Sequence, residues 1–205
     1  MKFEKQNVFF ASDFHVSHKN VIKFDKRPFD NIDEMHTELI KNWNSVVGPD
    51  DIVYYLGDFS LGRSETAKWF AHSLNGKIYY IMGNHDGDID TQRDIKALNR
   101  FERIHEYGTE IWIKDDDLKS ARGSNGYQQV ILCHYAILSW NRAHYGSWHL
   151  HGHSHGSLMK SEQDFYKRKV LDVGVNCIDY TPISYQQVKD IMSKREIISV
   201  DHHGE

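Results

Sequence analysis

Residues 8–15 read VFFASDFH, a short apolar run that ends at two polar side chains, Asp13 and His15. The run combines β-branched and aromatic residues and is too short for a helix, so it predicts a buried strand over residues 8–12. Asp13 and His15 lie two positions apart, and such residues share one face of an extended chain. Both side chains can therefore point into one crevice at the carboxyl end of the predicted strand.

The same pattern, an apolar run followed by polar side chains, occurs twice more in the first half of the chain. Residues 51–56 read DIVYYL and precede Asp58, and residues 77–82 read KIYYIM and precede Asn84 and His85. In α/β sheets, ligand sites gather outside the carboxyl ends of the strands. The three runs therefore predict a sheet that presents its polar groups at one edge.

Helical patterns fill the intervals between these runs. The clearest one begins at Asn31, where Asn31 and Glu34 form the signature of a capping box, and ends before Gly48 and Pro49. Three further helices are expected, from Ser64 to about Asn75, over residues 91–99, and from after Ser184 to about Lys194.

The second half of the chain is richer in predicted strands. They cover residues 103–106, 110–114, 130–133, 149–151 and 170–173, and the acidic stretch over residues 115–127 is typical of a loop. Alternating strands and helices followed mostly by strands predict an α/β fold, with a mixed sheet or two stacked sheets flanked by helices. No repeat or linker interrupts residues 1–205, so we expect a single domain.

The composition excludes several classes of protein. The chain has 29 acidic and 25 basic residues and a net charge of −4, which argues against tight, non-specific binding to duplex DNA. Cys133 and Cys177 lie in apolar runs, as buried free thiols do, and no zinc-binding CxxC pair is present. The apolar run near the N-terminus is too short for a signal peptide or a membrane span, so we expect a cytoplasmic protein without a membrane partner.

Histidine is the one residue type in excess, with 14 residues, as many as glycine. Six of them fall in four of five short polar segments: SDFH with Asp13 and His15, LGDF with Asp58, MGNHD with Asn84 and His85, LCHY with His134, and HGHSH with His153 and His155. Ligand sets with oxygen and nitrogen donors and no thiolate are typical of sites that bind Mn, Fe, Zn or Ni. They are less typical of structural zinc sites.

In this order the five segments resemble the signature of calcineurin-like metallophosphoesterases, which is DxH, GD, GNH[DE], H and GHxH. The flanking stretches HKNVIKFDKRPF, EMHTELIKNWNSVVGPDDIVYYLGDF and LSWNRAHYGSWHLHGHSHG resemble a subgroup of small bacterial and phage phosphoesterases. The resemblance implies a metallophosphoesterase-like sandwich of two stacked mixed sheets flanked by helices. It also implies an enzyme that hydrolyses phosphate esters.

The resemblance further implies a role for each matching residue. Asp13, His15 and His155 would hold one divalent ion, Asn84, His134 and His153 would hold a second, and Asp58 would bridge both. The two ions, with Mn²⁺ preferred over Fe, Zn or Ni, would activate a bridging water as hydroxide for in-line attack at phosphorus. His85 would be the catalytic group that steadies the developing charge or protonates the leaving oxygen.

The expected substrate is a small phosphomonoester or phosphodiester, including a nucleotide-like ester. Protein Ser/Thr phosphatases extend the GD block to GDxxDR, whereas this chain has Leu61 at the position of the acid, which disfavours a phosphoprotein substrate. One alternative is a phosphodiesterase or nuclease that acts on short single-stranded or cyclic nucleic acid. Another is a non-catalytic scaffold that keeps the fold without the chemistry.

Three residues outside the signature are candidates for binding the substrate. His18 lies just after the first segment, Arg142 has the shape to hold a phosphate, and Trp140 could stack with Trp148 on a flat group. Asp86 is expected to cap a turn rather than to bind metal. Five other histidines have structural interpretations, with His36, His72 and His105 at the surface or in the core and His149 and His151 behind the ligands.

Overall fold

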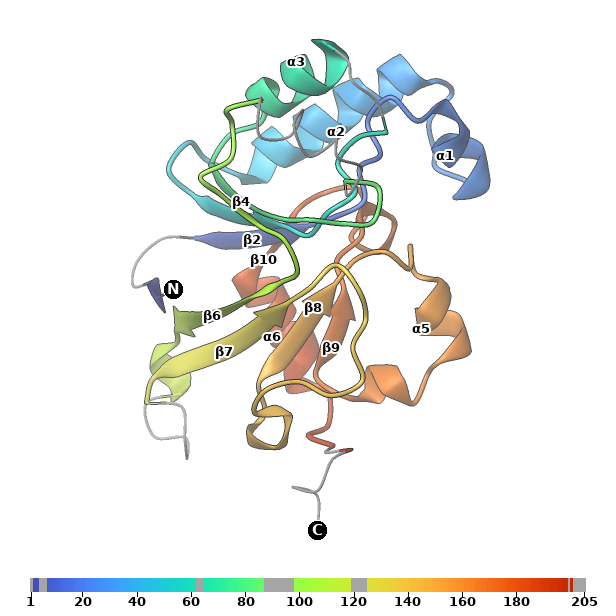
Figure 1. Ribbon diagram of the computed structural model, residues 1–205. Coiled ribbons are helices and arrows are strands. Elements are labelled where there is room, and N and C mark those ends of the chain that lie inside the picture. The colour runs from blue at the N-terminus through green and yellow to red at the C-terminus, as the bar shows by residue number, and fades with distance from the viewer. Residues whose placement is uncertain are drawn as a thin grey trace.

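Two five-stranded sheets lie face to face in the computed structural model, which describes residues 2–3, 7–61, 65–86, 98–118, 125–198 and 200 (Figure 1). The first sheet has the strand order β10-β2-β3-β4-β5, with β2 (Val8–Ala11), β3 (Ile52–Tyr55), β4 (Lys77–Ile81), β5 (Arg103–His105) and β10 (Ile183–Ser184). The second has the order β1-β6-β7-β8-β9, with β1 (Lys2–Phe3), β6 (Thr109–Lys114), β7 (Tyr127–Leu132), β8 (Trp148–His151) and β9 (Val170–Asp172). The expected two-sheet α/β sandwich is therefore confirmed.

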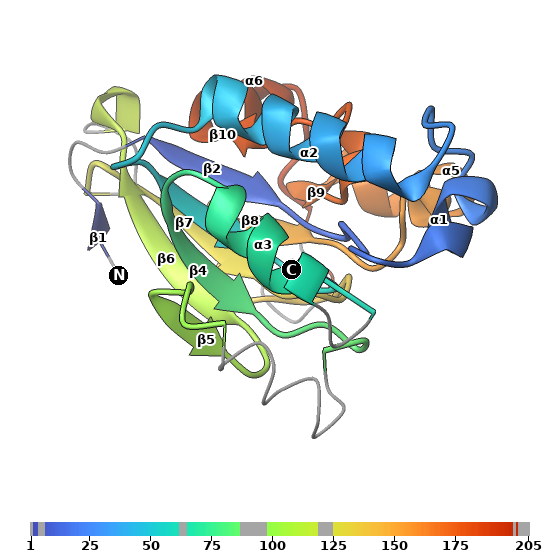
Figure 2. The same ribbon diagram turned by 90° about the horizontal axis from the view of Figure 1, so that it is seen from above.

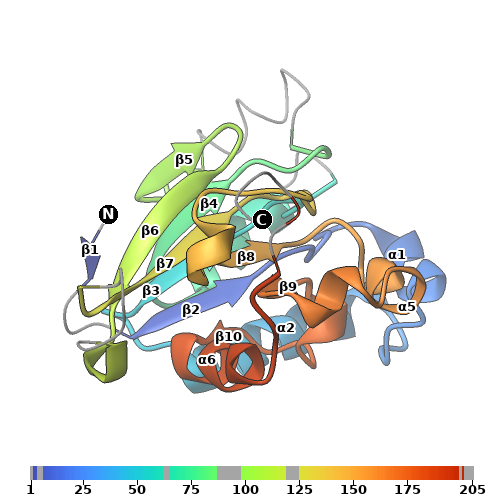
Figure 3. The ribbon, with the colours of Figure 1, turned by 90° about the horizontal axis from the view of Figure 1, so that it is seen from below.

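Helices cover the outside of this sandwich. They are α1 (Lys19–Phe24), α2 (Ile32–Val46), α3 (Glu65–Ser73), α5 (Ser157–Ser161) and α6 (Tyr185–Ser193), with short 3₁₀ helices at Asp116–Leu118, Ala143–Tyr145, Phe165–Lys167 and Val175–Cys177. Figure 2 shows α2 and α3 lying over the first sheet, and Figure 3 shows α6 beside β10. Within the described ranges, no helix has the length and apolar character needed to cross a membrane.

Strand direction brings the polar segments to one edge of the sandwich. In the first sheet β2, β3, β4 and β5 run parallel, and in the second β7, β8 and β9 run parallel. Carboxyl ends of parallel strands meet at the same edge. At that edge the two sheets also touch, because Ser12, after β2, pairs with Gly174, after β9, and the Val175 N–H donates to the Ser12 carbonyl at 3.0 Å.

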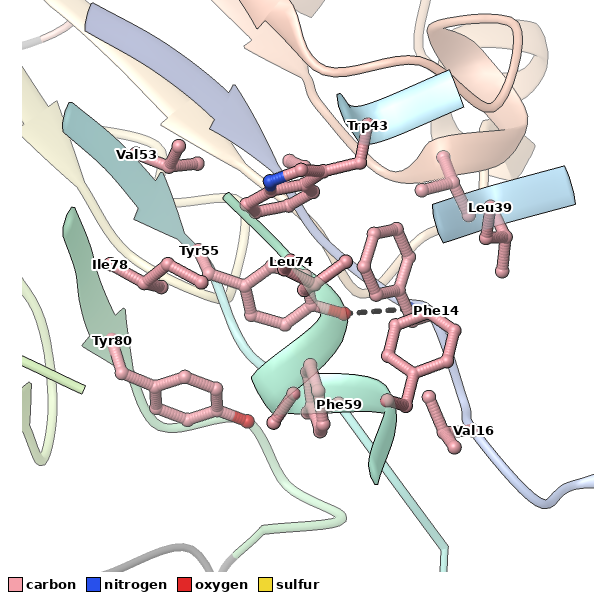
Figure 4. Close-up of a cluster of buried hydrophobic side chains, with 14 of the residues drawn as sticks. Phe14, Val16, Leu39, Trp43, Val53, Tyr55, Phe59, Leu74, Ile78 and Tyr80 are labelled. Carbon is pink, nitrogen blue, oxygen red and sulfur yellow. Dashed lines mark hydrogen bonds between the residues drawn. The ribbon is translucent and has the colours of Figure 1, made fainter. Parts of the chain in front are cut away.

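Aromatic side chains fill the layer between the first sheet and its helices (Figure 4). The ring of Phe14 lies 5.1 Å from that of Tyr55 and 5.6 Å from that of Trp43, measured between centroids. The Tyr55 hydroxyl accepts a hydrogen bond from the Phe14 N–H at 2.7 Å. Because Phe14 stands between Asp13 and His15, burial of its ring fixes the turn that carries both polar side chains.

Strand β2 is buried on both faces. Phe9 and Ala11 pack against the helices, while Val8 and Phe10 pack against the second sheet. A strand covered on both sides reads as a continuous apolar run instead of an alternating one. This explains why residues 8–11 show no polar position.

Both long capped helices begin where the sequence predicts. The Asn31 side chain accepts from the N–H groups of the first turn of α2, including that of Glu34 at 2.9 Å. Glu34 accepts from the Asp30 N–H at 2.6 Å and not from that of Asn31, so the expected capping box closes one residue further out. At α6 the reciprocal pair forms between Ser184 and Gln187.

Short elements escaped the sequence prediction. Strands β1 and β10 have two residues each, α5 has five and α1 has six, so none repeats an apolar pattern long enough to be recognised. Ser64 and most of the helix expected over residues 91–99 lie outside the described residues.

His149 in β8 is fully buried and bound as one neutral tautomer. Its Nδ1 lies 3.2 Å from the Ile131 carbonyl, to which it donates, and its Nε2 accepts from the Ile137 N–H at 3.1 Å. Burial lowers the pKa of His149 to about 3, so the unfolded chain binds a proton here below about pH 6.5 while the folded chain does not.

We therefore expect His149 to destabilise the folded protein as the pH falls below about 6.5, by up to about 1.4 kcal/mol for each pH unit until the folded pKa is approached. His149→Gln keeps a donor and an acceptor but does not titrate. The free energy of unfolding in urea, measured with EDTA at pH 7.5, 6 and 5, should therefore fall less steeply in the variant. Parallel pH dependences in the two proteins would contradict this role.

Candidate metal centre

The segments that follow five strands meet at the edge where the sheets touch. β2 leads to Asp13 and His15, β3 to Asp58, β4 to Asn84 and His85, β7 to His134, and β8 to His153 and His155. Backbone hydrogen bonds join these segments: the Asp13 N–H donates to the Gly57 carbonyl at 3.1 Å, and the Gly152 N–H donates to the His134 carbonyl at 3.0 Å. The His153 N–H also donates to the Asp13 carboxylate at 3.1 Å.

Asp13, His15 and His155 form a first donor group, in which one ligand atom from each residue lies within 4.8 Å of the others. Nε2 of His15 lies 3.1 Å from Nε2 of His155, which lies 3.7 Å from an Asp13 carboxylate oxygen. Asp13 and His15 are buried, and His155 is half-buried. The structure thus brings together the three residues that the resemblance assigns to one ion.

Asp58, His134 and His153 form a second donor group with the same 4.8 Å limit. Asn84 joins it, because its side-chain oxygen lies 3.0 Å from Nε2 of His134 and 2.8 Å from Nδ1 of His153. Asn84, His134 and His153 are the residues that the resemblance assigns to the other ion.

The Asp58 carboxylate of the second donor group also faces the first. Its Oδ2 is 3.7 Å from Nε2 of His15 and 3.5 Å from Nε2 of His134, and its Oδ1 accepts from the His85 N–H at 3.0 Å. Asp58 is 2% exposed, so its charge is held in the interior of the protein. This is the position that a ligand shared by two ions would require.

Backbone strain is concentrated at these residues. Five of the seven proposed ligands have a left-handed φ: Asp13 (63°), His15 (53°), Asp58 (57°), His153 (67°) and His155 (46°). The left-handed region costs a residue with a side chain about 1–2 kcal/mol. Strain of this kind persists where a site requires it, which supports a functional role for the cluster.

The imidazole tautomers fit a bound cation. Nδ1 of His134 donates to the Leu56 carbonyl at 2.6 Å, and Nδ1 of His155 donates to the Asp25 carboxylate at 2.7 Å. Each bond leaves the lone pair of Nε2 facing the centre of the cluster, which is the usual arrangement of metal-binding histidine. Two facing imidazole nitrogens and two buried carboxylates form a donor set for divalent ions.

Electrostatics in the cluster also favours a cation. Burial raises the pKa of Asp13 to about 7, so its carboxylate needs a positive partner to stay ionised at neutral pH. Burial opposes ionisation of Asp58 as well, but the hydrogen bond and charge of His134 outweigh it and lower the pKa of Asp58 to about 2. The same pairing raises the pKa of His134 to about 9 against the effect of burial. The negative charge of Asp58, which keeps His134 protonated, would attract a divalent ion in place of that proton.

Asp86 is a turn cap, as expected. Its Oδ2 accepts from the N–H groups of Asp58 and Gly83, both at 2.8 Å, and from the Tyr80 hydroxyl at 2.6 Å. Gly83 itself packs so closely that an added Cβ would collide with the Asp58 carboxylate. The GNHD segment therefore fixes the backbone of Asp58 as well as supplying Asn84.

His85 and His18 line the open side of the cluster. Nε2 of His85 lies 4.0 Å from Oδ2 of Asp58, and the His85 side chain is 45% exposed. The ring of His18 contacts that of His15 edge-on, with centroids 5.9 Å apart. Both line a cavity of about 560 Å³ together with Asp58, His153 and His155.

No family model matches the sequence. The uncharacterized protein MJ1445 of Methanocaldococcus jannaschii is 34% identical to the chain over 197 residues, which cover 94% of this chain and 95% of that protein. The chain belongs to the MJ1445 family.

A phage protein is also similar to the chain. The gene 66 protein of Mycobacterium phage L5 is 27% identical over 194 residues, which cover 83% of this chain and 86% of the phage protein. Among solved structures, the protein of unknown function AQ665 from Aquifex aeolicus superimposes with a TM-score of 0.65 at 20% identity, over 91% of this chain and all of AQ665. That likeness shows that the fold is shared.

Trp140 and Arg142, which were expected to bind the substrate, lie away from the donor groups in this member of the MJ1445 family. The structure thus corrects the sequence interpretation. Trp140 is 7% exposed, because its ring packs under the Arg168 guanidinium at 4.5 Å and its Nε1 donates to Ser147. A ring without a free face cannot stack on a ligand. Trp148 is likewise buried between the sheets.

Arg142 is the second correction. It lines a separate cavity with Trp112 and Tyr145, and its guanidinium lies 4.9 Å from the Tyr145 ring. It precedes β8, whereas the proposed ligands His153 and His155 follow that strand. Arg142 therefore stands at the wrong end of β8 to contact a substrate at the cluster.

Sequence reasoning missed Asp25 and Arg27, which support the first donor group. Asp25 accepts from Nδ1 of His155, and the buried Arg27 donates to Asp25 at 3.2 Å. Both belong to the stretch HKNVIKFDKRPF, whose charged residues have no role in the sequence prediction. A closely spaced acid and arginine beside the first metal segment was the available signal.

Proposed function

We propose that this protein is a dinuclear-metal-dependent phosphohydrolase of the calcineurin-like type that cleaves a small phosphomonoester or phosphodiester. The observation that carries the proposal is the arrangement of the two donor groups around the shared carboxylate of Asp58. A structural metal site has no need of a second ion or of an open side. Here the open side is a cavity lined by His85 and His18.

When bound, two divalent ions would neutralise the charge of a phosphoryl group and activate a water for in-line attack. The proposed ligands carry few negative charges, because only Asp13 and Asp58 among the seven are carboxylates. Two doubly charged ions on two carboxylates leave a net positive centre. Such a centre would bind an anionic phosphoester and stabilise the charge that grows during its cleavage.

His85 supplies the proposed proton transfer. Its backbone is fixed by the bond from its N–H to Asp58, while its side chain reaches the open cavity. A histidine in this position can donate a proton to the leaving oxygen or hydrogen-bond to the developing charge on phosphorus. The ring of His15 contacts that of His85 edge-on, with centroids 5.4 Å apart, and this contact restricts the orientation of the His85 ring.

The rim of the cavity favours, as a second candidate function, a phosphodiesterase that acts on short single-stranded or cyclic nucleic acid. Lys26 and Lys160 are exposed and line the cavity, and Phe24, also at the rim, is 70% exposed. Two cations beside an exposed ring suit a substrate with a flanking phosphate and a flat group, as in a short single-stranded or cyclic nucleic acid. The same rim is compatible with a mononucleotide ester.

Removal of metal is expected to abolish hydrolysis, and Mn²⁺ to restore it. The protein is dialysed against a chelator, freed of the chelator and assayed with bis-p-nitrophenyl phosphate and p-nitrophenyl phosphate before and after addition of Mn²⁺, Zn²⁺ or Ni²⁺. Restored cleavage of either ester supports the proposal, and the ratio of the two rates separates diesterase from monoesterase. Bound metal without hydrolysis of any ester, including nucleotides and short oligonucleotides, would favour the non-catalytic scaffold.

A further inference from the structure

The segment after α1 lines the cavity and contacts the first donor group there. Oδ2 of Asp25 lies 2.7 Å from Nδ1 of His155, a residue 130 positions later in the chain. The same oxygen accepts from Nη2 of Arg27 at 3.2 Å. Asp25 therefore contacts a proposed ligand on the side that faces away from the metal position.

Arg27 ties this contact to the turn that carries the other two ligands of the first donor group. Its guanidinium is fully buried, and Nη2 donates to the Asp13 carbonyl at 2.8 Å while Nη1 donates to the Phe14 carbonyl at 2.9 Å. Asp13 and His15 adopt the left-handed conformation, which needs such support. One arginine thus binds the turn and the carboxylate together.

We propose that Asp25 and Arg27 are positioning residues for the first metal ion and leave the second ion unaffected. The inference rests on the proposed dinuclear centre. Asp25 holds His155 in the tautomer with Nε2 free, and its charge strengthens that nitrogen as a donor. Arg27 holds Asp25 in place and fixes the backbone from which Asp13 and His15 extend.

The two donor groups differ in the group that accepts a hydrogen bond from Nδ1 of His155 in the first and of His134 in the second. Nδ1 of His155 meets a carboxylate, whereas Nδ1 of His134 meets the neutral carbonyl of Leu56. A merely structural ion pair would stabilise the fold and leave the two metal affinities in the same ratio. A positioning pair changes that ratio, because only the first donor group depends on the Asp25 charge.

The test is a titration of the metal-free protein with Mn²⁺, in which the free ion is measured by its EPR signal. We expect two sites in the unmodified protein, and Asp25→Ala should weaken one of them by about 10–100-fold while the other keeps its affinity. Asp25→Asn, which has the same shape and still accepts from Nδ1 but carries no charge, should give a smaller loss at the same site. Arg27→Lys should also weaken that site, because an ammonium cannot span two carbonyls and a carboxylate in Arg27's fork geometry.

The matched control is Asp115→Asn. Asp115 is also a paired carboxylate, with Lys189 Nζ at 2.7 Å and the Tyr185 hydroxyl at 2.6 Å, but it follows β6 at the opposite end of the second sheet. Its loss should change the unfolding temperature without changing either Mn²⁺ affinity. Near-UV circular dichroism checks that each variant is folded, and Asp25→Asn serves if Asp25→Ala is not.

The outcomes separate this inference from the proposed function. An unmodified protein that binds no Mn²⁺ would overturn the metal centre and this inference with it. Two sites in the unmodified protein, with both affinities unchanged or equally weakened in the Asp25 variants, would overturn the positioning role alone. Unchanged Mn²⁺ affinities in Arg27→Lys would show that Arg27 has no part in the positioning role.

Discussion

Asp58→Asn is expected to abolish tight binding of both metal ions and to lower turnover on the order of 10³-fold or more. Oδ2 of Asp58 lies 3.7 Å from His15 and 3.5 Å from His134, so this one oxygen serves both donor groups. An asparagine has nearly the same shape and still accepts from the His85 N–H through its oxygen. What it removes is the negative charge that faces both donor groups.

Metal content after gel filtration in buffer without added metal measures this prediction directly. The unmodified protein should retain close to two ions and the variant close to none, and the two should be compared at equal Mn²⁺ in the hydrolysis assay. Asp115→Asn serves again as the control for loss of a paired carboxylate far from the centre. Two retained ions in Asp58→Asn would refute the shared-ligand role.

The two donor groups were predictable because each of their residues follows a buried strand. Asp13 follows β2, Asp58 follows β3 and His134 follows β7, and parallel strands end at a common edge. The sequence therefore needed only the strand positions and the order of the five segments to indicate that these residues meet. The long helix α2 was predictable for a similar reason, since its apolar spacing and its Asn31 cap are both local signals.

The residues that were missed or misplaced depend on contacts between distant parts of the chain. Trp140 was expected to stack on a flat group, but the Arg168 guanidinium and Ser147 cover its indole. Burial of a loop residue depends on what packs over it, which the loop's own sequence does not contain. Asp25 acquires its role only because His155, 130 residues later, presents Nδ1 to it. The nearby acid and arginine mark Asp25 as a candidate, but no local pattern identifies His155 as its partner.

His85→Ala is expected to lower turnover by roughly 10²-fold or more while both metal ions stay bound. The side chain is 45% exposed and its Nε2 lies 4.0 Å from the Asp58 carboxylate, so the ring faces the cavity without belonging to either donor group. The part of His85 that supports the centre is its backbone N–H, which bonds to Asp58 at 3.0 Å and survives the substitution. In this variant the metal content should therefore stay unchanged while turnover falls, whereas in Asp58→Asn both should fall.

Measuring kcat and KM at saturating Mn²⁺, together with metal stoichiometry, tests this separation. If His85 protonates the leaving oxygen, the loss in kcat should be largest for an ester with a poor leaving group, such as a nucleotide or alkyl ester, and smaller for p-nitrophenyl esters, whose leaving oxygen needs no proton. His144→Ala, at a half-exposed histidine before β8, controls for the loss of an imidazole. Near-normal activity of His85→Ala on both kinds of ester would remove His85 from the mechanism. An equal loss on both would assign it to holding the phosphoryl oxygens, because charge on those oxygens develops whichever group leaves.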